Sequence, residues 1–229
     1  MNQHHVQEAY LKSFGDPSGK LWVYPKRGGK PLRRTAKQCA SREDFQSREL
    51  ELLQNRLVET PGIRAMRANG SLSEQEYHAL SAWMALHILR NARSRFELFD
   101  SRDDFDARFM DEFGKERLLS DYYRYVFTHP PTNSFFVTSD NPVIEFAVEG
   151  QFVRCCAISP EKMMLFSPID DQPFHELGIE DMFNALVWAN AVEYVFSHRK
   201  GVSIQRLEQF AKRYKMEPVE QNTSFLVRG

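Results

Sequence analysis

The chain has 229 residues, of which 42% are hydrophobic and 13% aromatic, and its 30 basic and 31 acidic side chains give a formal net charge of −1. This composition excludes an intrinsically disordered protein and excludes polyanion binding through overall charge, so any such site has to be a local basic patch. No segment is apolar for long enough to span a membrane, the start lacks a signal-peptide pattern, and Cys39, Cys155 and Cys156 form no spaced pairs, so a cytoplasmic protein with reduced thiols is expected.

The first elements in chain order are a short helix and a hairpin. Val6, Tyr10 and Phe14 recur every four residues, which predicts a helix over residues 4–14. Alternating residues at 21–24 and a second short run at 32–35 flank a loop rich in Lys, Gly and Pro. This pattern predicts the two strands of a β-hairpin.

Three helices are predicted next, over residues 44–66, 73–99 and 105–127. The first is expected to be interrupted near Pro61 and Gly62, because proline removes a backbone donor. The second begins with a capping box formed by Ser73 and Glu76, and the third has alternating charges on its outer face.

After residue 129 the composition becomes β-type. Short strands are predicted at 135–138, 143–146, 151–154 and 163–166, followed by a helix at 179–190, a strand at 192–197, a helix at 202–214 and a strand-like tail at 224–227. Runs of helix followed by runs of strand are typical of an α+β architecture, here a helical layer packed on a mostly antiparallel sheet. We therefore expect a single α+β domain over residues 1–229, helix-rich over 1–128 and strand-rich over 129–229.

Four segments together carry the pattern of a known family. They are His4-His5 with Tyr10-Leu11-Lys12-Ser13-Phe14, Glu43-Asp44-Phe45, the helical run over residues 85–95, and Thr138-Ser139-Asp140-Asn141-Pro142. In these the chain resembles the domain of unknown function 4238 family, a mainly bacterial group. It departs from the family where Pro usually follows the paired histidines, and at Gln46 and His87, where Tyr and Gln are usual. The resemblance implies a shared fold over nearly the whole chain and contributes little about activity.

Polar residues from distant segments form a set of the type used by metal-dependent phosphodiesterases. The candidate catalytic residues are His4, His5, Arg90 and Asp140, with His87 on the same helix face as Arg90, and the candidate metal ligands are Asp44, Glu51, Glu59 and Asp140. Carboxylates would hold Mg²⁺ or Mn²⁺, the cation would lower the pKa of a bound water, a histidine would move protons, and the arginine would stabilise phosphoryl charge. This set predicts hydrolysis of a phosphodiester, with nucleic acid as the substrate, provided that the residues converge around one open cleft.

The same residues also have structural interpretations. Arg90 can pair with Asp44, Glu51 or Glu59 on the neighbouring helix, which is the interpretation that an otherwise apolar helix favours. The adjacent histidines cannot both bind one metal by local geometry, so one of them can simply hold the N-terminus in place. Asp140 can close an Asx-type turn. If these interpretations hold, the alternative function is a non-enzymatic interaction protein, an inhibitor or adaptor with a protein partner.

A basic run on the predicted hairpin is a candidate nucleic-acid contact. It comprises Lys26, Arg27, Lys30, Arg33, Arg34 and Lys37, and Trp22 and Tyr24 precede it. Cations reach phosphates and aromatic rings can stack on bases, so Arg33, Arg34, Ser139 and Asn141 are the candidate substrate-binding residues. The interpretation that the pattern favours is a solvated hairpin whose charges prevent edge-to-edge pairing.

Overall fold

The computed structural model describes residues 2–4, 6–43, 48–68, 72–95, 123–128, 135–148, 151–168 and 179–214. The helices in these ranges are α1 (Glu8–Leu11), the 3₁₀ turn η1 (Lys12–Phe14), α2 (Ala36–Ala40), α3 (Arg48–Gln54), the π-helical turn η2 (Asn55–Glu59), α4 (Thr60–Arg67), α5 (Glu74–Arg95), α7 (Ile179–Asn190) and α8 (Ile204–Arg213). The strands are β1 (Asn2–His4), β2 (Lys20–Pro25), β3 (Leu32–Thr35), β4 (Ser41–Glu43), β5 (Tyr123–Thr128), β6 (Thr138–Ser139), β7 (Ile144–Val148), β8 (Gln151–Ser159), β9 (Lys162–Ser167) and β10 (Tyr194–Ser197).

The described strands form three antiparallel sheets. Their orders are β1-β4, β3-β2-β10-β6 and β5-β9-β8-β7. The predicted α+β class is confirmed, but the strands do not form the one sheet that we expected. Pro142, which has no backbone N–H to donate, separates β6 in one four-stranded sheet from β7 in the other.

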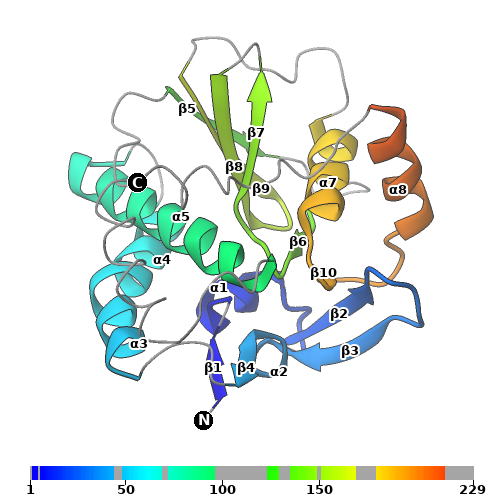
Figure 1. Cartoon of the computed structure of the whole chain (residues 1–229), viewed down its shortest axis with the longest axis horizontal. Coiled ribbons are helices and arrows are strands. Elements are labelled where there is room, and N and C mark those ends of the chain that lie inside the picture. The colour runs from blue at the N-terminus through cyan, green and yellow to red at the C-terminus, as the bar shows by residue number, and fades with distance from the viewer. Residues whose placement is uncertain are drawn as a thin grey trace.

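Helices lie on both sides of the β5-β9-β8-β7 sheet in the view of Figure 1, with α5 on one side and α7 and α8 on the other. Tyr77 of α5 meets Phe166 of β9 edge to face, with ring centroids 5.7 Å apart. Phe183 of α7 meets Phe136, just before β6, in the same way at 5.4 Å. One cluster of buried apolar side chains includes residues from Val6 to Ala211.

Tyr10 of α1 connects both four-stranded sheets. Its hydroxyl donates to the carbonyl oxygen of Ala157 in β8 at 2.9 Å, so its contact with Thr138 Oγ1 in β6, at 2.8 Å, is one in which it accepts. The ring contacts Trp83 of α5 at a centroid distance of 5.1 Å. Burial raises the pKa of Tyr10 well above its ordinary value, so the hydroxyl stays protonated and able to donate.

The interruption predicted near Pro61 is a change of helix type rather than a break. The chain is helical from α3 through η2 into α4, and Pro61 lies in the first turn of α4. Proline is tolerated in a first turn, and a π-helical turn accommodates the local change in hydrogen bonding.

The predicted hairpin, the capping-box helix and the helix at 179–190 are confirmed. β2 and β3 pair as expected, and the backbone N–H and hydroxyl of Ser73 both donate to Glu76 at 2.8 Å. The predicted strands at 143–146, 151–154, 163–166 and 192–197 correspond to β7, β8, β9 and β10, and the helix at 202–214 corresponds to α8.

Three predictions about secondary structure are wrong. Of the strand expected at 135–138, only Thr138 lies in a strand, β6, which continues to Ser139. Residues 123–127, expected to end a helix, form strand β5. The run Tyr-Arg-Tyr-Val-Phe-Thr is rich in aromatic and β-branched residues, which favour strands. The first helix begins at Glu8, whereas His4 belongs to β1 and pairs with Ser41 of β4. The rest of the predicted helix at 105–127 and the tail at 224–227 lie outside the described residues.

No helix in the described ranges has the length and apolar character that a membrane crossing requires. The three cysteines, Cys39, Cys155 and Cys156, are buried free thiols.

Helices α4 and α5 approach closely at Gly62. A Cβ atom at this position would lie 2.4 Å from Trp83 Cβ and 2.8 Å from Trp83 Cγ. Since Trp83 is fully buried and its indole N–H donates to Gln7 Oε1 at 3.1 Å, it has little freedom to move away.

Gly62→Ala should therefore lower the free energy of unfolding by about 1–3 kcal/mol through overpacking, although alanine is the better helix former. Urea unfolding followed by circular dichroism measures this change. Gly15→Ala is the matched control, because a Cβ there meets its neighbours at an ordinary 3.4 Å. Equal unfolding midpoints for the two variants would contradict the close approach of α4 and α5.

Candidate functional site

Arg90 lies in the core, paired with an acid of the neighbouring helix. Its side chain is 2% exposed, Nη1 forms an ion pair with Glu59, and Nη2 donates to Gln54 Oε1 at 2.6 Å. Glu59 and Gln54 are themselves buried. The structural interpretation of Arg90 is therefore the one that the geometry supports, with Glu59 as the partner among the three acids considered.

The other residues expected near Arg90 give no cluster of metal ligands. His87 is buried one turn before Arg90, with its ring centroid 4.2 Å from that of Trp83, and Glu51 is half-buried on α3. Asp44 and His5 lie outside the described residues. Across the described ranges, no group of three or more His, Cys, Asp or Glu side chains is placed to hold a metal ion.

Asp140 binds backbone rather than facing an open cleft. The residue is 8% exposed, and its carboxylate accepts from the backbone N–H groups of Val192 at 2.8 Å, Glu193 at 2.6 Å and Tyr194 at 3.1 Å. Burial raises the pKa of Asp140 to about 6, and the three N–H bonds oppose that rise. The carboxylate thus holds the junction between α7 and β10 against the end of β6.

The neighbours of Asp140 complete the same turn. Ser139 Oγ donates to the carbonyl oxygen of Asn141 at 2.7 Å and accepts from its backbone N–H at 3.1 Å. Asn141 Nδ2 donates to the carbonyl oxygen of Asn190, the last residue of α7, at 3.2 Å. The Ser139 bonds form a local serine turn, but Asp140 does not close the Asx-type turn that we expected, because its carboxylate bonds to backbone 52 to 54 residues away. Ser139 and Asn141, two of the predicted substrate-binding residues, are thus engaged in bonds within the fold.

The described candidates therefore do not share one site. Arg90 bonds to η2 and α3 through Glu59 and Gln54, whereas Asp140 bonds to the backbone between α7 and β10. The sequence interpretation also missed a second buried ion pair, in which Arg154 Nε of β8 donates to Glu145 Oε2 of β7 at 2.6 Å. The alternation of charged and apolar residues in those strands gave no sign that the charged face is also covered.

The hairpin divides its basic residues between two faces. In the β2–β3 register Trp22 pairs with Arg33 and Leu21 pairs with Arg34. Directly paired residues of antiparallel strands share a face, and successive residues point to opposite faces. Arg33 therefore lies with Trp22 and Lys20, whereas Arg34 lies on the other face with the buried Leu21.

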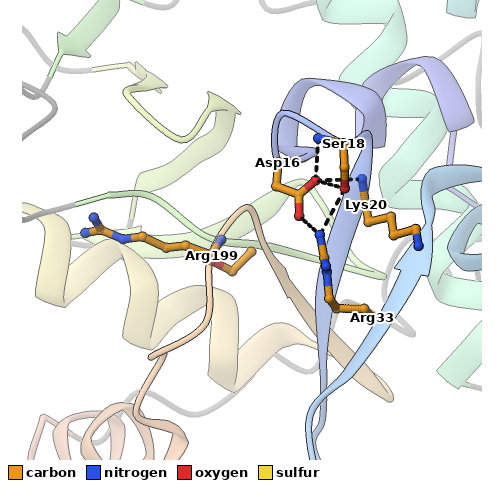
Figure 2. Close-up of polar contacts among 6 residues, drawn as sticks. Asp16, Ser18, Lys20, Arg33 and Arg199 are labelled. Atoms are coloured by element: carbon orange, nitrogen blue, oxygen red, sulfur yellow. Dashed lines mark hydrogen bonds and ion pairs between the residues drawn. The ribbon is translucent and has the colours of Figure 1, made fainter.

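Arg33 and Lys26 of the basic run have structural partners. Figure 2 shows a small network centred on the Asp16 carboxylate, in which Arg33 pairs with Asp16 and donates to Ser18 Oγ at 2.9 Å, while Arg199 points away. Hydrogen bonds from Ser18 and the backbone hold the pKa of Asp16 well below its usual range, so the pair stays ionised. Lys26 Nζ donates to the carbonyl oxygens of Ala189 and Ala191 at 2.8 and 2.6 Å, which caps the C-terminus of α7.

Four exposed cations remain around the hairpin, namely Lys20, Arg27, Lys30 and Lys200. Within the part of the chain that the structure describes, none of them forms an ion pair. Lys200 follows β10 and lies 5.6 Å from the Trp22 ring centroid, and Arg33 lies 5.8 Å from it. These four cations and Trp22 are called the basic hairpin surface below.

The sequence interpretation overlooked a pocket between α1, α4 and the start of α5. Its lining includes Gln7, Arg64 and Arg67, which belong to none of the candidate sets. A signal was present in the sequence, because Thr60, Ile63, Arg64 and Arg67 recur at i, i+3, i+4 and i+7 and so share one helix face.

Comparison of the chain with protein-family models, curated proteins and solved structures finds no match. The resemblance to the domain of unknown function 4238 family therefore stays a prediction.

Removal of Arg90 should destabilise the protein rather than leave a folded, inactive one. Arg90→Ala leaves the Glu59 carboxylate buried without its ion-pair partner, so the free energy of unfolding should fall by about 3–5 kcal/mol. The double variant Arg90→Met, Glu59→Leu removes both charges and should recover much of that loss. A single variant that unfolds at the wild-type urea concentration would rule out a buried structural pair.

Asp140 should make folding stability depend on pH with an unusual sign. The pKa in the fold, about 6, lies above the ordinary 3.8, so the folded state binds the proton more tightly than the unfolded chain. The protonated Asp140 contributes its full stabilisation at pH values below the pKa of the unfolded chain. This stabilisation, about 3 kcal/mol in total, is lost as the pH rises through the pKa of the folded state. The Asp140→Asn variant cannot ionise at this position. Its free energy of unfolding, measured with urea, should therefore rise relative to that of the wild type as the pH increases from about 4 to about 6. Parallel pH profiles for the two proteins would contradict the raised pKa.

Proposed function

We propose that this protein is a non-enzymatic interaction protein that binds nucleic acid through the basic hairpin surface. The observation that carries the proposal is the group of four exposed cations, Lys20, Arg27, Lys30 and Lys200, which have no carboxylate partner among the described residues. In a chain with a net charge of −1, such a group forms a local region of positive potential that the overall charge does not provide.

The chemistry of this surface favours contacts with phosphates over contacts with bases. Trp22 is half-buried, and Arg33 and Lys200 lie within 6 Å of its ring centroid, at 5.8 and 5.6 Å. A base could stack on the ring only by displacing a cation from it. Binding is therefore expected to depend strongly on salt and little on sequence.

Phosphodiester hydrolysis, the first function that the sequence predicts, has weaker support from the geometry. The guanidinium of Arg90 and the carboxylates of Glu59 and Asp140 are all buried and hydrogen-bonded within the fold. A phosphate could reach them only after those bonds had broken. Hydrolysis stays a prediction, and the binding experiment below also tests it.

Neutralising the basic hairpin surface should weaken nucleic-acid binding. For duplex DNA, each cation that contacts a phosphate makes the plot of log binding constant against log salt concentration steeper by about 0.9. The triple variant Arg27→Gln, Lys30→Gln, Lys200→Gln should therefore lower the slope by about 3 and weaken binding at low salt. Fluorescence anisotropy with labelled duplex and single-stranded DNA and RNA, over a salt series, measures both quantities.

The matched control removes three exposed cations from other elements, through Arg56→Gln in η2 and Lys212→Gln and Arg213→Gln at the end of α8. It has the same net charge, so an equal loss in both variants would mean that overall charge, not the hairpin, determines binding. Unchanged binding in the hairpin variant would leave edge protection of β3 as the role of its charges. Cleavage that requires Mg²⁺ or Mn²⁺ and stops with chelator would instead favour hydrolysis.

A further inference from the structure

A pocket of about 560 Å³ lies between the start of α1, one face of α4 and the first turn of α5. Its lining residues are Gln7, Ala9, Thr60, Ile63, Arg64, Arg67, Ala68 and Glu76. Pockets that hold small molecules have volumes of about 300–1,000 Å³ and combine apolar walls with a few convergent polar groups. The lining has that character, since alanine and isoleucine side chains alternate with two guanidinium groups, an amide and a carboxylate.

The two arginines bring positive charge that is not paired with any carboxylate of the described residues. Arg67 Nη2 donates to the carbonyl oxygen of Ala9 at 3.1 Å, which fixes the guanidinium at the pocket wall and leaves its other donors. Arg64 makes no hydrogen bond or ion pair with any residue in the described ranges. Neither guanidinium is paired with a carboxylate there, and both lie on the face of α4 that lines the pocket.

Gln7 adds an amide donor with a fixed orientation. The residue is 7% exposed, and its Oε1 accepts from the indole N–H of Trp83 at 3.1 Å. This bond leaves the amide nitrogen, Nε2, as the group that Gln7 has for the pocket, and Nε2 has no hydrogen-bond partner among the described residues. An acceptor in the pocket can therefore take a hydrogen bond from Nε2 without breaking one within the described fold.

Glu76 provides the opposite charge. Its Oε2 accepts from the backbone N–H and hydroxyl of Ser73, both at 2.8 Å, and these bonds lower the pKa of the carboxyl. Glu76 therefore stays ionised at the edge of the pocket and would repel a simple anion. It would attract an ammonium group, which makes a ligand with both charges the best electrostatic match.

We propose that this pocket binds a small zwitterionic molecule, with its acidic group, a carboxylate or a phosphate, on Arg64, Arg67 and Gln7 and its ammonium group near Glu76. Planar guanidinium groups suit either acid because they donate two parallel hydrogen bonds. The pocket shares no residue with the basic hairpin surface, so this inference does not depend on the proposed nucleic-acid binding.

The test titrates the full chain with β-alanine, phosphoethanolamine and inorganic phosphate at millimolar concentrations, followed by ¹H–¹⁵N NMR. Both zwitterions should shift the Gln7 side-chain amide and the backbone amides of Ala9 and Ala68, and the tighter one identifies the acidic group. Inorganic phosphate should bind more weakly, because it leaves Glu76 without a cation. Equal binding of inorganic phosphate would overturn the role of Glu76, and no shift with any probe would overturn the site.

Arg64→Gln is the decisive variant, because Arg64 carries no bond within the described fold that its removal would break. It should weaken binding of the tighter zwitterion about tenfold. Arg56→Gln, which removes an exposed arginine of η2 outside the pocket lining, is the matched control and should leave binding unchanged. Equal affinities of the two variants would show that the shifts arise elsewhere.

Discussion

The hydroxyl of Tyr10 is the contact on which the arrangement of the fold depends. It joins Thr138 of one four-stranded sheet to Ala157 of the other, from a helix of only four residues. The ring leans against Trp83, and the indole of Trp83 in turn orients the amide of Gln7. A short helix has little stability of its own, so these tertiary bonds are what keep α1 in place. Through them, the position of the pocket wall follows from the position of the two sheets.

Ionisable groups with the chemistry of a catalytic site serve here to specify structure. Arg90 with Glu59 and Arg154 with Glu145 are buried pairs, and Asp140 is satisfied by three backbone donors. Burying two charges carries a desolvation penalty that the attraction between them offsets only when both groups are well positioned and their remaining donors and acceptors are hydrogen-bonded. Because each partner restricts the position of the other, these groups define how α5 meets η2 and how β7 registers with β8. Functional contacts are consequently expected at the surface and in the pocket.

The spacing of residues that are close in sequence predicted most of the helices and strands. It could not predict the surroundings of the candidate site residues, because these depend on contacts between distant parts of the chain. The capping box of Ser73 and Glu76 and the alternation in β2 depend on near neighbours, and both were recognisable. The run at 123–128 was misread because aromatic and charged residues at this spacing fit the outer face of a helix as well as a strand. The burial of Arg90 and Asp140 depends on partners 31 and 52 to 54 residues away, and no spacing within one element reveals these. Which face of the hairpin each arginine occupies follows from strand register, which was not known beforehand.

The π-helical turn η2 has a consequence for the phase of the long helical stretch in which it lies. One residue corresponds to about 100° of rotation in an α-helix, so a turn wound more widely resets the direction in which every later side chain projects. Gln54, the last residue of α3, and Glu59, the last residue of η2, are five residues apart, and both bond to the buried Arg90. Ordinary α-helical winding would turn two residues at this separation about 140° away from each other. The i→i+5 bonding of the irregular turn instead places them nearly one above the other, so both side chains can reach a single guanidinium.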